Sequence, residues 1–304
     1  MNDVLTDLRF GLRMLAKTPV VSGVAALSLG LGIAAATAMF AWASAFWLEP
    51  LPFGNQEGLV LVRELRHGES IDMAAGASPA NFRDWSKATT TLSAMALMSQ
   101  NRVNVTGLDV PEQIVVSEGT PNLLQVLQIH PFLGRAFRPD EGLEGAEDVV
   151  IITHPYWERR FNLEPEILGR PLVLDGSPHT IVGVMPEDFE MFPAGVEAFR
   201  PVDISGIEER GSKGWTAFGR LREGATLEQA RSELTAVQAR LEAEYPEGNR
   251  GWGLLVQNAR QWFPGPTDTK LIILMVAVSL FGVAIACANV ANLLLSKAET
   301  RMKE

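Results

Sequence analysis

The stretch Val20 to Leu48, VVSGVAALSLGLGIAAATAMFAWASAFWL, contains no charged side chain. A helix of this length would extend ~43 Å at about 1.5 Å per residue, more than the ~30 Å hydrocarbon core of a bilayer. A second uncharged run, Leu271 to Ser296, is bounded by two lysines. The sequence therefore predicts two membrane-spanning helices that flank one long polar segment.

Small residues in the first run favour close packing of another helix. Gly30 and Ala34 are four residues apart, as are Gly32 and Ala36, so each pair lies on one helical face. This spacing lets two membrane helices approach closely. The glycines also resemble a dinucleotide-binding fingerprint, but no strand is predicted before them and their neighbours are apolar. We interpret them as a helix-packing face.

Two amides in the second run, Asn289 and Asn292, need hydrogen-bonding partners. Leaving such a group unpaired in an apolar environment costs roughly 2–7 kcal/mol. Their separation of three residues places both on one helical face. We interpret them as groups that hydrogen-bond to neighbouring membrane helices, with a role in a moving gate as the alternative.

The charges predict the orientation of the chain in the membrane. Residues 1–48 and residues 271–304 each carry a net charge of +1. Because the whole chain has a net charge of −10, residues 49–270 carry −12. Lys and Arg close to membrane spans favour the cytoplasmic side, so both ends, the N-terminus included, are expected in the cytoplasm and the acidic segment outside. A segment this acidic is a poor candidate for binding nucleic acid or an anionic membrane surface. We expect membrane lipid, and no nucleic acid, among the partners of the chain.

A cleaved secretory signal peptide is the alternative interpretation of the first run. Ala43-Ser44-Ala45 is typical of a cleavage site. The apolar run is, however, about twice the length of a signal h-region, which favours a retained membrane span.

We predict five segments. They are a cytoplasmic amphipathic helix (1–19), a first transmembrane helix (20–48), an extracytoplasmic domain (49–270), a second transmembrane helix (271–296) and the cytoplasmic start of a continuation (297–304). The fold class is thus an α+β membrane protein with two transmembrane helices flanking a large extracytoplasmic α/β domain.

The polar segment predicts β-α-β units at both of its ends and a strand-rich second lobe between them. The first unit comprises a strand at 59–63, a helix at 80–87 capped by Ser78-Pro79, and a strand at 95–99. The second comprises a strand at 217–221, a helix at 227–244 capped by Thr226, and a strand at 252–256. In the middle we predict strands at 103–106, 113–116, 149–153, 171–174 and 180–184, and helices at 120–127 and 154–161.

No motif in the chain predicts catalysis, a cofactor or a metal. Gly206 to Lys213 lacks the residue order of a phosphate-binding loop, and the lone cysteine, Cys287, lies in the second apolar run. The four histidines show no metal-ligand spacing. Four arginines form the densest basic group in the acidic segment, and we expect structural ion pairs for them, with a binding site as the alternative. They are Arg135, Arg159, Arg160 and Arg170.

Short motifs throughout the chain resemble the MacB/FtsX-type ABC transporter permeases, most closely the branch called ADOP permeases. The matching pieces are LRFGLRMLAKTP at 8–19, PLPF at 50–53, LGRAF at 133–137, YWERRF at 156–161, ILGR at 167–170, IVGVMP at 181–186, GRLREG at 219–224 and ACANVANLLL at 286–295, followed by Arg301 and Glu304. Their order and spacing extend over most of the sequence.

The resemblance implies a permease subunit of the inner membrane, without enzymatic chemistry or a cofactor, that transmits ATP-driven motion to a MacB-like periplasmic core domain for efflux or extraction of a substrate. It implies a cytoplasmic ATP-binding subunit and a second permease unit, by dimerisation or internal duplication. It also implies a four-helix unit that continues beyond Glu304. The alternative function is a membrane-anchored sensor or ligand-binding module without transport.

Overall fold

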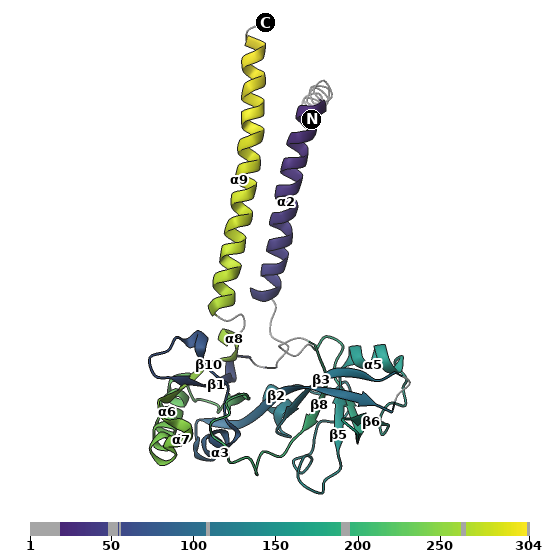
Figure 1. Ribbon diagram of the computed structural model, residues 1–304, viewed down its shortest axis with the longest axis vertical. Helices are drawn as coiled ribbons and strands as arrows, with labels where there is room; N and C mark the ends of the chain where they lie inside the picture. Colours follow the sequence, from purple (N-terminus) through teal and green to yellow (C-terminus); the bar gives the residue numbers. More distant parts are fainter. Residues whose placement is uncertain are drawn as a thin grey trace. The chain divides into compact units, whose positions relative to one another are not determined.

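The computed structural model describes residues 19–47, 54, 56–107, 110–189, 195–262 and 266–302 (Figure 1). The chain divides into a helical unit, Met1–Glu49 with Pro264–Glu304, and a larger unit, Pro50–Phe263. Of the predicted amphipathic helix at 1–19, all but Pro19 lies outside the described residues.

The helical unit consists of α2 (Pro19–Trp47) and α9 (Pro266–Met302), which pack against each other. Helix α9 begins before the predicted span at 271–296 and continues past it, because Pro266 suits a first helical turn and residues 297–302 are good helix formers. Within the described residues, one helical segment, Thr269–Asn292, is long and apolar enough to cross a membrane. Helix α2 contains a shorter apolar segment, Ala26–Ala41, so the first span stays a prediction.

The predicted β-α-β units form the first lobe of the larger unit, and their strands interleave. The strand order is β10-β1-β9-β2, and neighbouring strands are antiparallel. Each unit therefore has its two parallel strands separated by a strand of the other unit, which is the split β-α-β arrangement of ferredoxin-like folds. The elements are β1 (Leu59–Arg66), α3 (Pro79–Ala88), β2 (Leu92–Thr106), β9 (Thr216–Leu221), α6 (Leu227–Glu244) and β10 (Trp252–Asn258).

The predicted helix caps are confirmed in this lobe. The Ser78 hydroxyl accepts the backbone N–H of Asn81, and Thr226 forms a reciprocal capping box with Gln229. Helices α3 and α6 pack on the sheet and share one core cluster with it, in which Trp85 is fully buried. A short helix, α7 (Pro246–Asn249), follows α6.

Strand β2 corrects the sequence prediction of two separate strands at 95–99 and 103–106. It is a single strand of 15 residues, and the polar stretch 100–102 continues in it. Strand β3 (Glu112–Gly119) pairs with it without interruption, from Met98 opposite Gly119 to Val105 opposite Glu112, so backbone hydrogen bonds keep these polar residues extended. The strand therefore runs from the first lobe into the second.

The second lobe continues the same sheet in the order β3-β8-β5-β7-β4, with β6 pairing β2 and β7. The predicted hairpin at Asp175-Gly176 is confirmed, with φ values of 48° and 86° that suit a type I′ turn. The predicted helix at 154–161 is confirmed as α5. The strands are β4 (Leu133–Gly134), β5 (Val149–Ile152), β6 (Pro171–Leu174), β7 (Ser177–Val184) and β8 (Val196–Pro201).

Further local features differ from the prediction. Helix α4 (Leu123–Leu127) begins later than residue 120, because the Thr120 hydroxyl accepts the backbone N–H of Leu97 and does not cap the helix. Strand β8 was not predicted. The other short elements are η1 (Gln56–Gly58), η2 (Ile71–Met73) and α8 (Ala259–Trp262).

Candidate functional site

Gly32 of α2 lies against α9. A Cβ atom built on Gly32 would lie 3.5 Å from the Cβ of Ala286 and 3.6 Å from the Cα of Val283. A larger side chain at this position would push the helices apart, because the backbone of α9 lies directly opposite. Of the two predicted packing glycines, Gly30 and Gly32, it is Gly32 that contacts α9.

The other predicted packing residues differ in their surroundings. Ala36, on the same face as Gly32, is half-buried, whereas Ala34 is exposed and a Cβ on Gly30 would meet open space. Asn289 and Asn292 are both exposed on α9. Their predicted hydrogen bonds to neighbouring helices thus stay a prediction.

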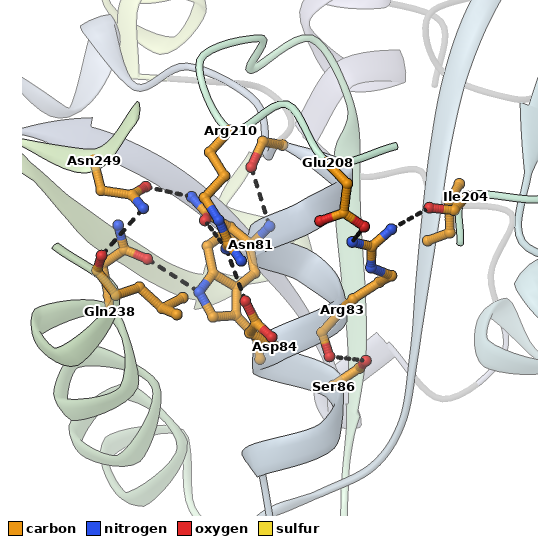
Figure 2. Close-up of polar contacts among 12 residues, drawn as sticks. Asn81, Arg83, Asp84, Ser86, Ile204, Glu208, Arg210, Gln238 and Asn249 are labelled. Atoms are coloured by element: carbon orange, nitrogen blue, oxygen red, sulfur yellow. Dashed lines mark hydrogen bonds and ion pairs between the residues drawn. The ribbon is translucent and has the colours of Figure 1, made fainter. Parts of the chain in front are cut away.

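The segment 202–215, here called the strap, connects β8 to β9 and is fastened to α3 of the first lobe (Figure 2). Arg83 Nη1 donates to the Ile204 carbonyl at 2.7 Å, and its Nη2 lies 2.8 Å from Glu208 Oε1. Arg210 Nη1 lies 2.7 Å from both Asp84 Oδ2 and Asn81 Oδ1. The strap is thus held along its length by arginine contacts.

A buried ion pair fixes the end of the strap. Lys213 Nζ lies 2.5 Å from Glu64 Oε2, and the two side chains are 4% and 0% exposed. The other oxygen of Glu64 accepts the backbone N–H of Ser78 at 3.0 Å and the Asn81 amide at 3.1 Å. Asn81 also donates to Asn249, 2.6 Å away (Figure 2). These polar groups are engaged with one another, so the cluster joins the strap to β1, α3 and α7.

A row of polar side chains crosses the sheet where the two lobes meet. Glu118 on β3 lies directly opposite Arg200 on the parallel strand β8, and Arg200 Nε donates to its Oε1 at 2.9 Å. Asn101 on β2 donates to the other oxygen at 2.7 Å. Three neighbouring strands are therefore joined by side chains as well as by backbone.

A cleft of about 850 Å³ lies between α4, the segment 136–139 and the strands β2 and β9. Arg220 on β9 is 8% exposed at its wall and donates to two backbone carbonyls, those of Val126 and Gly54. Burial lowers the pKa of the Arg220 guanidinium from its ordinary value, but arginine remains charged in proteins. The described residues that line the cleft are Ser93, Ala94, Pro121, Asn122, Gln125, Val126, Gln128, Ile129, His130, Ala136, Phe137, Pro139 and Arg220.

The expected ion pairs of the four arginines are confirmed. Arg135 binds Glu141 at 2.6 Å, Arg170 pairs with Glu164, and Arg159 and Arg160 both pair with Glu112. Among the residues that the structure describes, no three His, Cys, Asp or Glu side chains gather where they could hold a metal ion. The ring of His154 lies edge-on between those of Phe132 and Trp157.

A family model for the MacB-like periplasmic core domain matches residues 22–237, which is more than half of the chain. The chain belongs to the MacB-like family of ABC transporter permeases. It is a membrane protein with an extracytoplasmic segment, and the mixed α/β larger unit resembles MacB periplasmic domains.

Two solved structures illustrate the fold of this MacB-like chain. The periplasmic region of MacB from Actinobacillus actinomycetemcomitans is 12% identical, with a TM-score of 0.50 over 68% of this chain and 90% of that one. A domain of a protein described as a permease, from Porphyromonas gingivalis, is 14% identical, with a TM-score of 0.51 over 68% and 91%. At such low identity these likenesses establish the fold alone. A comparison with curated protein sequences gives no match.

Sequence reasoning missed the strap and the cleft. Arg83 and Ile204 are 121 residues apart, and the cleft is lined by four segments from separate parts of the chain. The only local signal is that Arg220, a charged residue, occupies a strand whose other residues are otherwise apolar or small.

Proposed function

We propose that this MacB-like chain is a permease subunit in which α2 and α9 both cross the inner membrane, with the N-terminus in the cytoplasm. Motions driven by a separate cytoplasmic ATPase pass through these helices to the extracytoplasmic domain and serve efflux or extraction of a substrate. The family membership and the candidate span Thr269–Asn292 support this proposal.

The observation that carries the proposal is the pairing of β1 with β10. Strand β1 is the first strand after α2 in the chain, and β10 is the last before α9. The two are neighbouring antiparallel strands, with Val60 opposite Asn258 and Arg66 opposite Trp252. A displacement of either helix thus acts on adjacent strands of one sheet. Because that sheet runs through both lobes, it can carry the displacement as a unit.

The contact at Gly32 supports a coupled movement of the two helices. Close packing along α2 and α9 resists independent sliding, since a shift would bring larger side chains against the backbone of α9. In this proposal a second permease unit completes the transporter, as a dimer or by the internal duplication of ADOP permeases, and Asn289 and Asn292 hydrogen-bond to helices outside the α2–α9 pair.

A second candidate function is ligand sensing without transport. The cleft between α4 and residues 136–139 favours it, because its volume is in the range of small-molecule sites. In that case the membrane helices anchor the domain, and no ATPase partner is required.

One experiment distinguishes the permease from the ligand sensor. The full-length gene product is affinity-purified from native membranes in mild detergents, and the proteins that accompany it are identified by mass spectrometry. A P-loop ATPase recovered in stoichiometric amount supports the permease. An unrelated tagged membrane protein from the same cells is the control for adventitious partners. Failure to recover an ATPase in several mild detergents would contradict the permease proposal and favour the sensor.

A further inference from the structure

Among the residues that the structure describes, the sheet has one long edge strand, β10. At the other end of the strand order, β4 has two residues, and β6 pairs with both β2 and β7. Strand β10 has seven residues and pairs with β1 on one side. The other side of an edge strand presents backbone N–H and C=O groups with which a strand of another chain can pair.

Alternate residues of β10 turn their backbone groups away from β1. The Gly251 carbonyl accepts the backbone N–H of His67, so it faces the β1 side. In an antiparallel pair every second residue hydrogen-bonds to the neighbouring strand, and the residues between them point to the opposite side. The outward-facing residues of β10 are therefore Trp252, Leu254 and Val256.

The sequence of β10 contains none of the residues that usually protect an edge. The strand reads WGLLVQN, without a charged residue or a proline. Charged side chains and proline are common means by which edge strands avoid pairing with other chains. Protection of this edge must therefore come from a neighbouring element.

Helix α6, which packs against β10, provides side chains that occupy the outward carbonyls (Figure 1). Arg231 donates to the Val256 carbonyl from Nη2 at 3.0 Å and from Nε at 3.3 Å. Two turns later, Gln238 Nε2 donates to the Trp252 carbonyl at 3.3 Å. Arg231 is itself held by Glu228, whose Oε1 lies 2.5 Å from its Nη1. Two of the three outward carbonyls are thus engaged by the helix.

We propose that Arg231 and Gln238, here called the edge guard, prevent β10 from pairing with β10 of a second copy of the chain. Two such strands fit together antiparallel about Leu254, because the same outward groups then meet across a two-fold axis. An incoming strand needs the carbonyls that the edge guard occupies, so the guanidinium must leave before the strands can pair. The edge guard acts within the larger unit and can be tested whether or not the proposed transport function holds.

Peptide binding tests the edge guard on the full chain, with one chain in each lipid nanodisc. The probe is a fluorescein-labelled peptide of residues 251–258, which supplies the strand of a second copy, and fluorescence anisotropy measures its Kd. Arg231→Leu should bind the peptide at least about tenfold more tightly than the parent chain, because hydrogen bonds from a charged group no longer compete for the Val256 carbonyl. Equal affinity of the parent chain and Arg231→Leu would overturn the proposal.

A second peptide distinguishes strand pairing from apolar adhesion. It carries methyl groups on the backbone nitrogens that correspond to Leu254 and Val256, so it keeps the side chains but cannot donate from those nitrogens. It should not bind Arg231→Leu, and equal affinity for both peptides would overturn the proposal. Arg240→Leu, an exposed position on the same helix, is the control and should bind the first peptide as weakly as the parent chain does.

Glu228→Ala provides a second way to loosen the edge guard. Its side chain is 76% exposed, so its removal should leave the fold intact while Arg231 loses the carboxylate that holds it. The peptide affinity should then rise, though less than in Arg231→Leu. Leu254→Pro removes an outward N–H that β1 does not use, and should abolish binding when combined with either variant. If Arg231→Leu does not fold by circular dichroism, an affinity of Glu228→Ala equal to that of the parent chain would overturn the proposal.

Discussion

Lys213 Nζ lies 2.5 Å from Glu64 Oε2, and both side chains are almost completely shielded from water. The pair joins the strap to β1 beneath α3. Removing one partner of a buried pair leaves an uncompensated charge, which costs about 3–5 kcal/mol. We therefore expect Glu64→Gln to lower the melting temperature by roughly 6–20 °C for a domain of this size, measured by circular dichroism.

An exposed ion pair in the middle of the strap provides the control for this prediction. Glu208 pairs with Arg83 but its side chain is 78% exposed, so Glu208→Gln should change stability by no more than about 0.5 kcal/mol. Equal effects of the two substitutions would show that burial of the Lys213–Glu64 pair is not what fastens the strap.

Cysteines at positions 32 and 286 should form a disulfide. The Cβ built on Gly32 lies 3.5 Å from the Cβ of Ala286, within the range of about 3.5–4.5 Å for natural disulfides. In a Cys287→Ser background, Gly32→Cys with Ala286→Cys should cross-link α2 to α9 under mild oxidation. The cross-link is detected by mass spectrometry of linked peptides. Gly30→Cys with Ala286→Cys is the control, and cross-linking of both pairs to the same extent would contradict the described contact.

Glu233 should make the first lobe sensitive to acid. Burial acts to raise the pKa of its carboxyl group, but hydrogen bonds from the side chains and backbone of Thr91 and Thr90 outweigh it and lower the pKa to about 2. A carboxyl with a depressed pKa in the folded state stabilises the fold above its unfolded pKa of about 4.5, and that stability is lost as the pH falls toward 2.

The measurement is the difference in stability between the parent chain and Glu233→Gln. This difference should be largest above pH 5 and should shrink steadily between pH 4.5 and pH 2. Glu228→Gln, on the same helix with a 76% exposed side chain, is the control. A difference that does not vary with pH would mean that the contacts of Glu233 do not depend on its charge.

The capping box of α6 should contribute measurably to stability. Thr226 accepts the backbone N–H of Gln229, and the Gln229 side chain accepts that of Thr226. Thr226→Ala should cost about 1 kcal/mol, whereas Thr226→Ser, which keeps the hydroxyl, should cost much less. The free energies of unfolding of the two variants are compared by urea titration, with the dependence on urea concentration (the m-value) unchanged between them. Equal losses of stability in both variants would contradict a capping role.

Local patterns were sufficient to predict several elements. Helix α6 has the predicted bounds because a cap, an apolar face and a following proline all lie within its own sequence. The hairpin at Asp175-Gly176 likewise depends on a dipeptide that accepts positive φ. The split order of the first lobe could not be predicted, since the strands that separate β1 from β2 and β9 from β10 come from the other end of the domain.

Strand β8 shows why other elements were missed. Glu197 fits the alternation of a strand, but buried Phe199 followed by Arg200 breaks it. The two charged residues are accommodated by distant partners, Arg159 and Glu118 respectively. The continuity of β2 through its polar middle depends in the same way on pairing with β3. The cleft and the strap depend on contacts between segments far apart in sequence. The small residues of α2 were predicted as a packing face, but which of them meets α9 required the helix pair itself.

Because β1 and β10 are neighbouring strands, the chain enters and leaves the larger unit close together, as in a domain inserted into another protein. Neighbouring strands of a sheet are about 4.8 Å apart, so the unit is entered and left at adjacent points. Domains whose ends lie close together tolerate transplantation into other scaffolds. Evolution and protein engineering can therefore exchange this whole domain between two helices, or graft another domain in its place, without redesigning the helices that carry it.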